Sequence, residues 1–372
     1  MEEKFSYRRY LILIFFITCI FFPLITGVYA EQNQPGTRTV TVSVDPRVEL
    51  ISIIFRLAGN REYNQGKVLS YTSDVEKQFG PYKDHPVIEF AVSLRKKYGV
   101  SFDAPMSLAV HISDVNSMKM RVPLEPQPVG LDTRWRPEDI RDFLEKAGQF
   151  AKVSDFNEFI ETHRPLYEKS SERMRSLLEE EAHLEWFDDF FGARPGANFH
   201  IFLGMINGPS NYGAKIKLAQ TEEYYCILGV WSAGLLGFGE PKFNKNMLPI
   251  VIHEFCHSYA NQIVDAHLSE LQKPGEKIFA KVSKKMERMA YGNWQTMMRE
   301  SLVRACVVRY RAKNEGEDAA KKQIQSEIGN GFFWMQELSD VLIKYEQQRD
   351  KYPSLEAFFP EVVDFYNNYE ID

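Results

Sequence analysis

Two histidines and a glutamate in the segment Val251–Ala260 have the spacing of a metal-binding helix. His253 and His257 are four residues apart, which is close to one helical turn, so both imidazoles project from the same side. Glu254 follows the first histidine, where its carboxylate lies at the edge of that side and can take a proton from water. The chain has only eight histidines, so chance rarely produces this spacing. The pattern predicts a zinc site with a general base.

The residues around the motif predict a helix with one apolar side. At about 100° per residue, five side chains share a broad face: Ile252, Phe255, Cys256, Tyr259 and Ile263. The two histidines fall outside this face, next to the glutamate. The helix can therefore bury one side in a core and present the other to a metal. The alternative is that the histidines lie on an ordinary surface helix, or are buried and satisfied by neighbours, with no metal.

A catalytic zinc site needs a third protein ligand and an open position for water. Motifs that take a third histidine from the same helix require it where this chain has Ile263, and Ala260 replaces their turn glycine, so a metzincin is excluded. A carboxylate on the next predicted helix is the better candidate, and Glu300 in the segment Trp294–Ala305 supplies it. The alternative is that Glu300 only forms a salt bridge with Arg304, four residues later.

Further side chains are candidates for positioning or transition-state roles. Asn261 and Asp265, on the motif helix, can orient a histidine through its second ring nitrogen. An oxyanion donor is also expected to face the metal, and four residues can supply it: Tyr212, Tyr291, Arg304 and Tyr310. The sequence does not rank these four, and each can equally be structural.

The order of predicted elements indicates an α+β fold in which the motif helix follows a small, mostly antiparallel sheet. Strands are expected over 199–206, 213–219 and 223–231, followed by a glycine-rich loop. The motif helix is expected over about 244–268 and the next helix over about 294–311, with a charged connection between them. Helical patterns on either side of this region predict a helix-rich N-terminal lobe and a helical C-terminal lobe, with the site in the cleft between them.

Together these residues resemble the gluzincin group of zinc metallopeptidases, in which a glutamate on a following helix completes an H-E-x-x-H motif. Three segments, Asp45–Leu50, Asn211–Gly213 and Glu300–Ala305, are similar to one family of exported bacterial proteins. That family is catalogued as a domain of unknown function (number 4932) and is presumed to be metallopeptidase. The resemblance extends over most of the chain from about Val40 and brings no known substrate.

The resemblance implies a zincin-like fold in which His253, His257 and Glu300 bind one Zn²⁺ and Glu254 is the general base for hydrolysis of a peptide or protein substrate. In zincins an extended substrate pairs with an edge strand. The expected edge strand is 213–219, with these substrate-binding residues: Gly213, Ala214, Lys215, Ile216 and Lys217. Two other functions stay open. One is a non-catalytic exported zinc-binding or interaction protein, such as a degenerate peptidase; the other is a zinc hydrolase of a non-peptide amide.

Residues 1–30 have the pattern of a secretory signal peptide, with Lys4, Arg8 and Arg9 before an apolar run. Export is therefore expected, with an uncleaved membrane anchor as the alternative. After a linker over 31–39, one metallopeptidase domain is expected over 40–372. Its parts are an N-terminal helical lobe (about 40–192), a sheet and zinc-helix region (about 193–312) and a C-terminal helical part (about 313–372).

Composition argues against several other classes of protein. The net charge of −6 and the lack of a basic patch with interleaved aromatic residues give no reason to expect a nucleic-acid partner. Beyond the predicted signal peptide the chain has three cysteines, Cys226, Cys256 and Cys306, without C-x-x-C spacing. They are expected to be buried thiols rather than a disulfide framework or a zinc site, although one pair can still be bridged.

Overall fold

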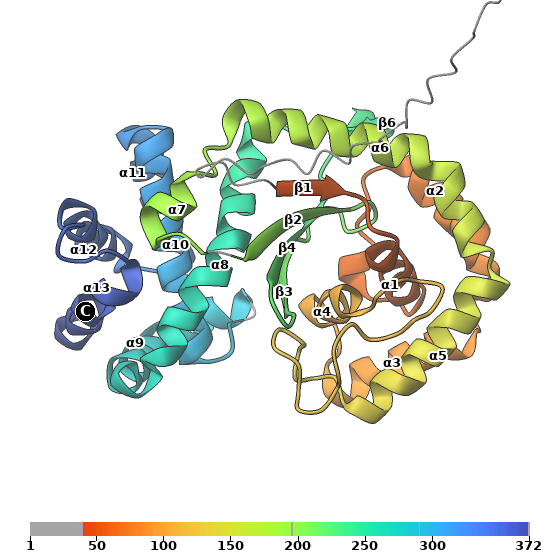
Figure 1. The fold of residues 1–372 in the computed structure, drawn as a ribbon, viewed down its shortest axis with the longest axis horizontal. Helices are drawn as coiled ribbons and strands as arrows, with labels where there is room; N and C mark the ends of the chain where they lie inside the picture. The colour runs from red at the N-terminus through yellow and green to blue at the C-terminus, as the bar shows by residue number, and fades with distance from the viewer. Residues whose placement is uncertain (1–39, 195, 290, 371–372) are drawn as a thin grey trace, which may run out of the picture. The chain divides into compact units, whose positions relative to one another are not determined.

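The computed structural model describes residues 40–194, 196–289 and 291–370, which all belong to one structural unit, Arg38–Asp372 (Figure 1). The predicted signal peptide (1–30) and linker (31–39) lie outside the described residues. Within the described ranges, no helix combines the length and the apolar character that crossing a membrane requires.

A four-stranded sheet has the strand order β1-β2-β4-β3. The strands are β1 (Val40–Ser43), β2 (Ala197–Gly204), β3 (Tyr212–Lys217) and β4 (Glu222–Gly229). β1 and β4 run parallel to β2, whereas β3 runs antiparallel to β4. The α+β class and the small sheet are confirmed, but the sheet is mixed, and the expected mostly antiparallel pairing is wrong. β4 lies between β2 and β3, so these consecutive strands are not neighbours and β3 is an edge strand.

The chain between β1 and β2 is helical. Its elements are α1 (Pro46–Leu57), η1 (Arg61–Tyr63), α2 (Leu69–Phe79), η2 (Gly80–Tyr82), α3 (Pro86–Tyr98), α4 (Asp103–His111), α5 (Pro137–Val153), α6 (Phe156–Glu181) and α7 (Trp186–Phe191). Asp45 caps α1 by accepting a hydrogen bond from the backbone N–H of Arg47, and α3 ends at Gly99 in the left-handed conformation. A crossover of this length allows β1 and β2 to run parallel.

The chain after β4 forms a short hairpin and then more helices. The elements are β5 (Ala233–Leu235), β6 (Phe238–Pro241), η3 (Lys245–Met247), α8 (Leu248–Ala266), α9 (Leu268–Arg288), α10 (Trp294–Asn314), α11 (Glu317–Asn330), α12 (Met335–Gln347) and α13 (Leu355–Asn368). The expected glycine-rich loop is the β5–β6 hairpin, and the expected charged connection is α9. α9 keeps its charges on one face, while Leu271, Ile278, Val282 and Met286 recur at helical spacing on the buried face.

The sheet is buried on both faces, because its side chains alternate between two hydrophobic cores. Phe199 and Cys226 belong to the core shared with α8 and α10, whereas Phe202 and Ile227 belong to the core shared with α1 and α4. Figure 1 shows this division, with α8 to α10 on one side of the sheet and α1 to α5 on the other. α10 packs along α8, and α8 also contacts β3 and β4. The motif helix is thus held between the sheet and the helix that carries Glu300.

The described cysteines are buried free thiols, as expected. Cys226 lies on β4, Cys256 on α8 and Cys306 on α10, and each has no exposed surface. The thiol of Cys256 interacts with that of Cys306 where the two helices pack together. Cys256 therefore belongs to the core side of the motif helix, away from the histidines.

Candidate metal centre

α8 buries its predicted apolar side and directs the two motif histidines elsewhere. The five residues of that side are each at most 5% exposed: Ile252, Phe255, Cys256, Tyr259 and Ile263. The side chains of His253 and His257 are about one-fifth exposed, and their rings meet edge to face with centroids 4.8 Å apart. Helical periodicity alone accounts for this division of the helix into a core side and a site side.

The carboxylate of Glu300 on α10 completes a group of three possible ligands. The Nε2 atoms of His253 and His257 are 3.2 Å apart. From the Glu300 carboxylate, Oε2 is 3.6 Å from Nε2 of His253, and Oε1 is 3.4 Å from Nε2 of His257. A tetrahedral ion with bonds of about 2.0–2.1 Å holds its ligand atoms about 3.3 Å apart. The nearest ligand atoms of the three side chains are thus separated by distances close to those that such an ion requires. With one ligand atom taken from each residue, all lie within 4.8 Å of one another, so the group could hold a metal ion.

Each of the two histidines can offer its Nε2 atom to a metal. Burial lowers the pKa of His253 well below its usual range, and the neighbouring His257 and Arg304 lower it further. His253 is therefore neutral and has a lone pair for a metal. His257 places Nδ1 at 3.2 Å from Oδ1 of Asn261, one turn along α8. With the proton on Nδ1, this hydrogen bond leaves Nε2 free to bind a metal, which is the positioning role predicted for Asn261.

Two of the predicted oxyanion donors contact Glu300 instead. The hydroxyl of Tyr291 donates to Oε2 of Glu300 at 2.9 Å, and Nε of Arg304 lies 3.3 Å from the same oxygen. Arg304 also donates to the Tyr291 hydroxyl at 2.9 Å and to Glu327 at 2.5 Å. One carboxylate oxygen of Glu300 is thus held by its neighbours, while Oε1 faces His257. These contacts hold the Glu300 carboxylate in place rather than present a donor to a substrate.

Glu254 lies at the edge of the group, against the sheet. A β-carbon placed on Gly213 of β3 would be 3.0 Å from Oε2 of Glu254, so the missing side chain of this glycine leaves room for the carboxylate. Burial raises the pKa of Glu254 to about 7, and the charge of Glu300 adds to the rise. A carboxyl with a pKa near neutrality can accept and return a proton under the same conditions, which suits a general base.

Three other predicted residues do not contact the group. Asp265 forms an ion pair with Arg299 at 2.6 Å and orients neither histidine. Tyr310 accepts a hydrogen bond from the backbone of His183 and packs in the core behind α7. Tyr212 faces the opposite side of the sheet from Gly213, because successive residues of a strand alternate. The structure therefore places neither tyrosine where it could stabilise an oxyanion, and Asp265 does not have the orienting role predicted for it.

β3 is the expected edge strand, but part of its edge is covered. A β-carbon on Gly130 would be 2.0 Å from the carbonyl oxygen of Lys215, so the loop around Gly130 packs directly on the β3 backbone. Gly130 has φ +89°, a conformation that glycine adopts without strain. Of the five predicted substrate residues, Gly213 and Lys217 are exposed, Ala214 and Lys215 are half-buried and Ile216 is buried. A strand added to β3 must use the Gly213 end or displace this loop.

Sequence reasoning did not identify two charged residues near the group. Glu327 on α11 is 3% exposed and pairs with Arg304, which in turn contacts Glu300. Asp103, at the start of α4, contributes to the raised pKa of Glu254. Both come from helices distant in sequence from the motif. The contact of Glu327 depends on how α11 folds back onto α10, for which the sequence carries no short motif.

Comparison with known proteins places the chain in a family without assigning an activity. No curated protein and no solved structure matches it. The family model described as Domain of unknown function (DUF4932) matches residues 40–365, which is most of the chain and includes every residue of the candidate metal centre. The protein therefore belongs to the DUF4932 family.

Proposed function

We propose that this protein is a zinc-dependent peptidase of the gluzincin type. The observation that carries the proposal is the grouping of His253, His257 and Glu300, whose nearest ligand atoms are 3.2–3.6 Å apart, with Glu254 beside it. Two imidazoles and one carboxylate are the ligand set of many catalytic zinc sites, which keep one position open. Zinc held by such a set lowers the pKa of water at the open position and polarises a carbonyl group.

The chain's own residues supply the remaining chemistry. Glu254 accepts the proton of the attacking water and passes it to the leaving amine, which its pKa of about 7 permits near neutral pH. Asn261, Tyr291 and Arg304 fix the orientation of the ligands. β3 is the edge strand available for backbone hydrogen bonds to an extended peptide. In this scheme the uncovered Gly213 end of β3 lies next to the general base.

A zinc site with a structural role usually has four protein ligands. Among the residues that the structure describes, the candidate group has three, and the carboxylate of Glu254 stands next to it. This favours catalysis over the non-catalytic alternative. A non-peptide amide as substrate remains an outcome of the test below. The proposal includes export of the protein by its N-terminal segment, and the substrate would then be an extracytoplasmic peptide or protein.

The decisive experiment compares metal content with hydrolysis. The purified full-length protein is loaded with zinc, its metal is quantified by elemental analysis, and its products from a peptide library are identified by mass spectrometry. Glu254→Gln should retain about one zinc ion per chain and lose hydrolysis by about a hundred-fold or more. Glu276→Gln, which changes an exposed glutamate on α9, is the matched control and should behave like the wild type.

The possible outcomes separate the candidate functions. Zinc binding without hydrolysis of any peptide or amide by the wild type would refute the catalytic role. Hydrolysis that persists in Glu254→Gln would refute the role of Glu254. Retention of zinc after Glu300→Ala at wild-type affinity would show that another group is the third ligand, and the gluzincin assignment would then be wrong.

A further inference from the structure

A strained turn lies where the N-terminal helices approach the candidate metal centre. The backbone N–H of Ala104 donates to the carbonyl of Ser101 at 3.2 Å, which closes a β-turn with Phe102 at its first central position. Phe102 has φ 56° and ψ −112°, the angles of a type II′ turn. Glycine is the residue that normally occupies this position, because a β-carbon there is crowded by the backbone. A phenylalanine with these angles is an outlier.

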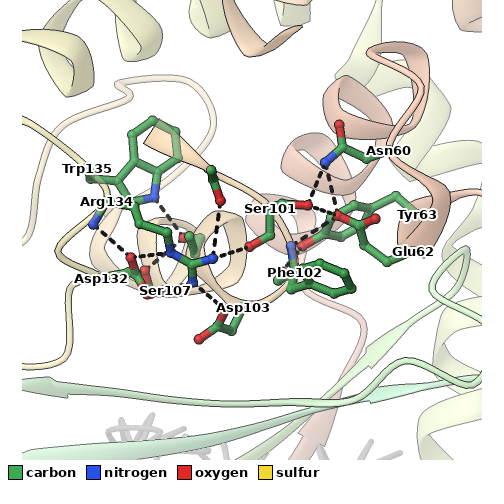
Figure 2. Close-up of polar contacts among 12 residues, drawn as sticks. Asn60, Glu62, Tyr63, Ser101, Phe102, Asp103, Ser107, Asp132, Arg134 and Trp135 are labelled. Carbon is green, nitrogen blue, oxygen red and sulfur yellow. Dashed lines mark hydrogen bonds and ion pairs between the residues drawn. The ribbon is translucent and has the colours of Figure 1, made fainter. Parts of the chain in front are cut away.

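Polar contacts hold this turn on both sides (Figure 2). The carboxylate of Glu62, a 5% exposed residue, accepts hydrogen bonds from the backbone N–H of Phe102 at 3.0 Å and from the Ser101 hydroxyl at 2.5 Å. The hydroxyl of Tyr63 donates to the carbonyl of Phe102 at 2.5 Å. The guanidinium of Arg134 donates to the carbonyl of Ser101 at 3.1 Å. The surrounding structure therefore maintains Phe102 in a conformation that its own side chain disfavours.

The side chain of Phe102 gains little burial in return. It is 54% exposed, whereas the neighbouring Tyr63 and Ala104 have no exposed surface. Glycine would adopt the same turn without strain, so the fold itself does not account for a phenylalanine here. Strained residues that the surrounding structure maintains are concentrated at functional sites. The observation therefore calls for a role outside the stability of the fold.

The turn is close to the part of β3 that contacts the general base. α4 begins at Asp103, within the turn, and packs against β3. Tyr63, which holds the turn, stacks on Tyr212 of β3 with ring centroids 6.1 Å apart. Tyr212 precedes Gly213, the residue against which Glu254 lies.

We propose that Phe102 is a substrate-binding residue of this site and that its ring forms one wall of a subsite for a large apolar side chain. The inference rests on the proposed peptidase function and adds to it the class of residue that a substrate must carry. The held backbone fixes where the Phe102 side chain leaves the chain, and the ring, which is 54% exposed, has a face left to cover. Covering that face with an apolar side chain stabilises the complex at little cost in conformational entropy.

The test measures peptide binding separately from hydrolysis. Zinc-loaded Glu254→Gln protein is titrated with fluorescently labelled decapeptides that carry Phe, Leu, Ala or Asp at each position in turn, and Kd is obtained from fluorescence anisotropy. We expect tighter binding of peptides with Phe or Leu at one position. Adding Phe102→Gly should weaken the binding of those peptides about ten-fold and leave the alanine peptide unchanged. Phe102→Leu should retain most of the preference.

A control and a stability measurement exclude a merely structural effect. Phe238→Ala removes a phenylalanine of similar exposure, 63%, from the β5–β6 hairpin and should not change the preference. Phe102→Gly should melt at the same temperature as the parent protein or higher, because glycine relieves the turn. A lower melting temperature together with weaker binding of all peptides would show that Phe102 supports the fold, and it would overturn the inference.

Other outcomes distinguish this inference from the proposed function. If Phe102→Gly binds every peptide as the parent does, or if the parent binds none, Phe102 is not a substrate-binding residue. Hydrolysis of the same peptides by the wild-type protein is measured in parallel. Phe-selective binding that depends on Phe102, without hydrolysis by the wild type, would support the subsite and refute the peptidase.

Discussion

Glu49 on α1 makes the stability of the fold depend on pH in a predictable direction. Its side chain has no exposed surface, and its carboxylate accepts hydrogen bonds from the backbone N–H of Met205 at 2.9 Å and from the hydroxyl of Tyr71 at 2.7 Å. Burial raises the pKa of Glu49 to about 7 although both hydrogen bonds lower it. We predict that Glu49→Gln, which keeps an acceptor for Met205 and carries no titratable proton, removes this pH dependence.

The magnitude follows from the two pKa values. A glutamate in the unfolded chain has a pKa of 4.5, and in the folded protein Glu49 has a pKa of about 7. Between these values the unfolded state releases the proton while the folded state keeps it, so the free energy of unfolding falls as the pH rises. Each pH unit corresponds to 1.36 kcal/mol, so the loss is about 3 kcal/mol and is complete above pH 7. Below pH 4.5 the contribution is fully present.

The assay is urea unfolding of metal-free protein between pH 4.5 and 8, with Glu49→Gln compared with the wild type at each pH. The difference in free energy of unfolding between variant and wild type cancels the groups that titrate equally in both proteins. From pH 4.5 to pH 8 this difference should rise by about 3 kcal/mol in favour of the variant. Glu62→Gln is a control whose difference from the wild type should stay nearly constant over this range, because the pKa of Glu62 in the folded protein lies below 4.5 and its carboxylate is ionised in both states. Burial acts to raise the pKa of Glu62, but hydrogen bonds from Ser101, Asn60 and the backbone of Phe102 lower it overall. A difference for Glu49→Gln that does not change with pH would refute the reasoning.

Two further predictions concern the candidate metal centre. Asn261→Ala should weaken zinc binding about 10–100-fold, because the Nδ1 atom of His257 loses its hydrogen-bond acceptor. Competition with a chromophoric chelator measures the zinc affinity. As a control, Gln262→Ala, which changes the exposed neighbouring residue, should bind zinc like the wild type. Gly213→Ala should lower the rate of hydrolysis about ten- to hundred-fold, because a methyl group 3.0 Å from Oε2 of Glu254 must displace that carboxylate. Zinc content and melting temperature should stay unchanged. Gly329→Ala, which adds a methyl group where nothing lies within 4 Å, is its control, and equal hydrolysis by the two variants would contradict the contact.

The parts of the fold that were predictable depend on local patterns. The start of α1 at Asp45 and Pro46 and the end of α3 at Gly99 follow from capping chemistry within a few residues. The apolar side of α8 follows from its periodicity. Strand order does not follow in this way. β2 and β4 are buried on both faces, so their side chains carry little information on which strand is adjacent.

The grouping of His253, His257 and Glu300 was predictable because its spacing and its helices are each local, but its surroundings were not. Phe102 and Gly213 illustrate the difference. From sequence, Gly213 is only the first residue of a strand, and its role in leaving room for Glu254 depends on how β3 lies over α8. Phe102 occupies a turn position that favours glycine, and only the backbone angles reveal it. Contacts between distant segments determine both features.

The sequence also presented two uses of Glu300, a metal ligand or a salt bridge to Arg304, as alternatives, and the structure shows that they are compatible. A carboxylate has two oxygens, and here Oε2 contacts Arg304 and Tyr291 while Oε1 faces His257. The charges around Glu300 are also compatible with a bound cation. Arg304 is shared by Glu300 and the buried Glu327, so two carboxylates face one guanidinium, and burial keeps His253 neutral. Buried charges are stable only when they are compensated, so a divalent cation between the histidines and Glu300 would balance this cluster.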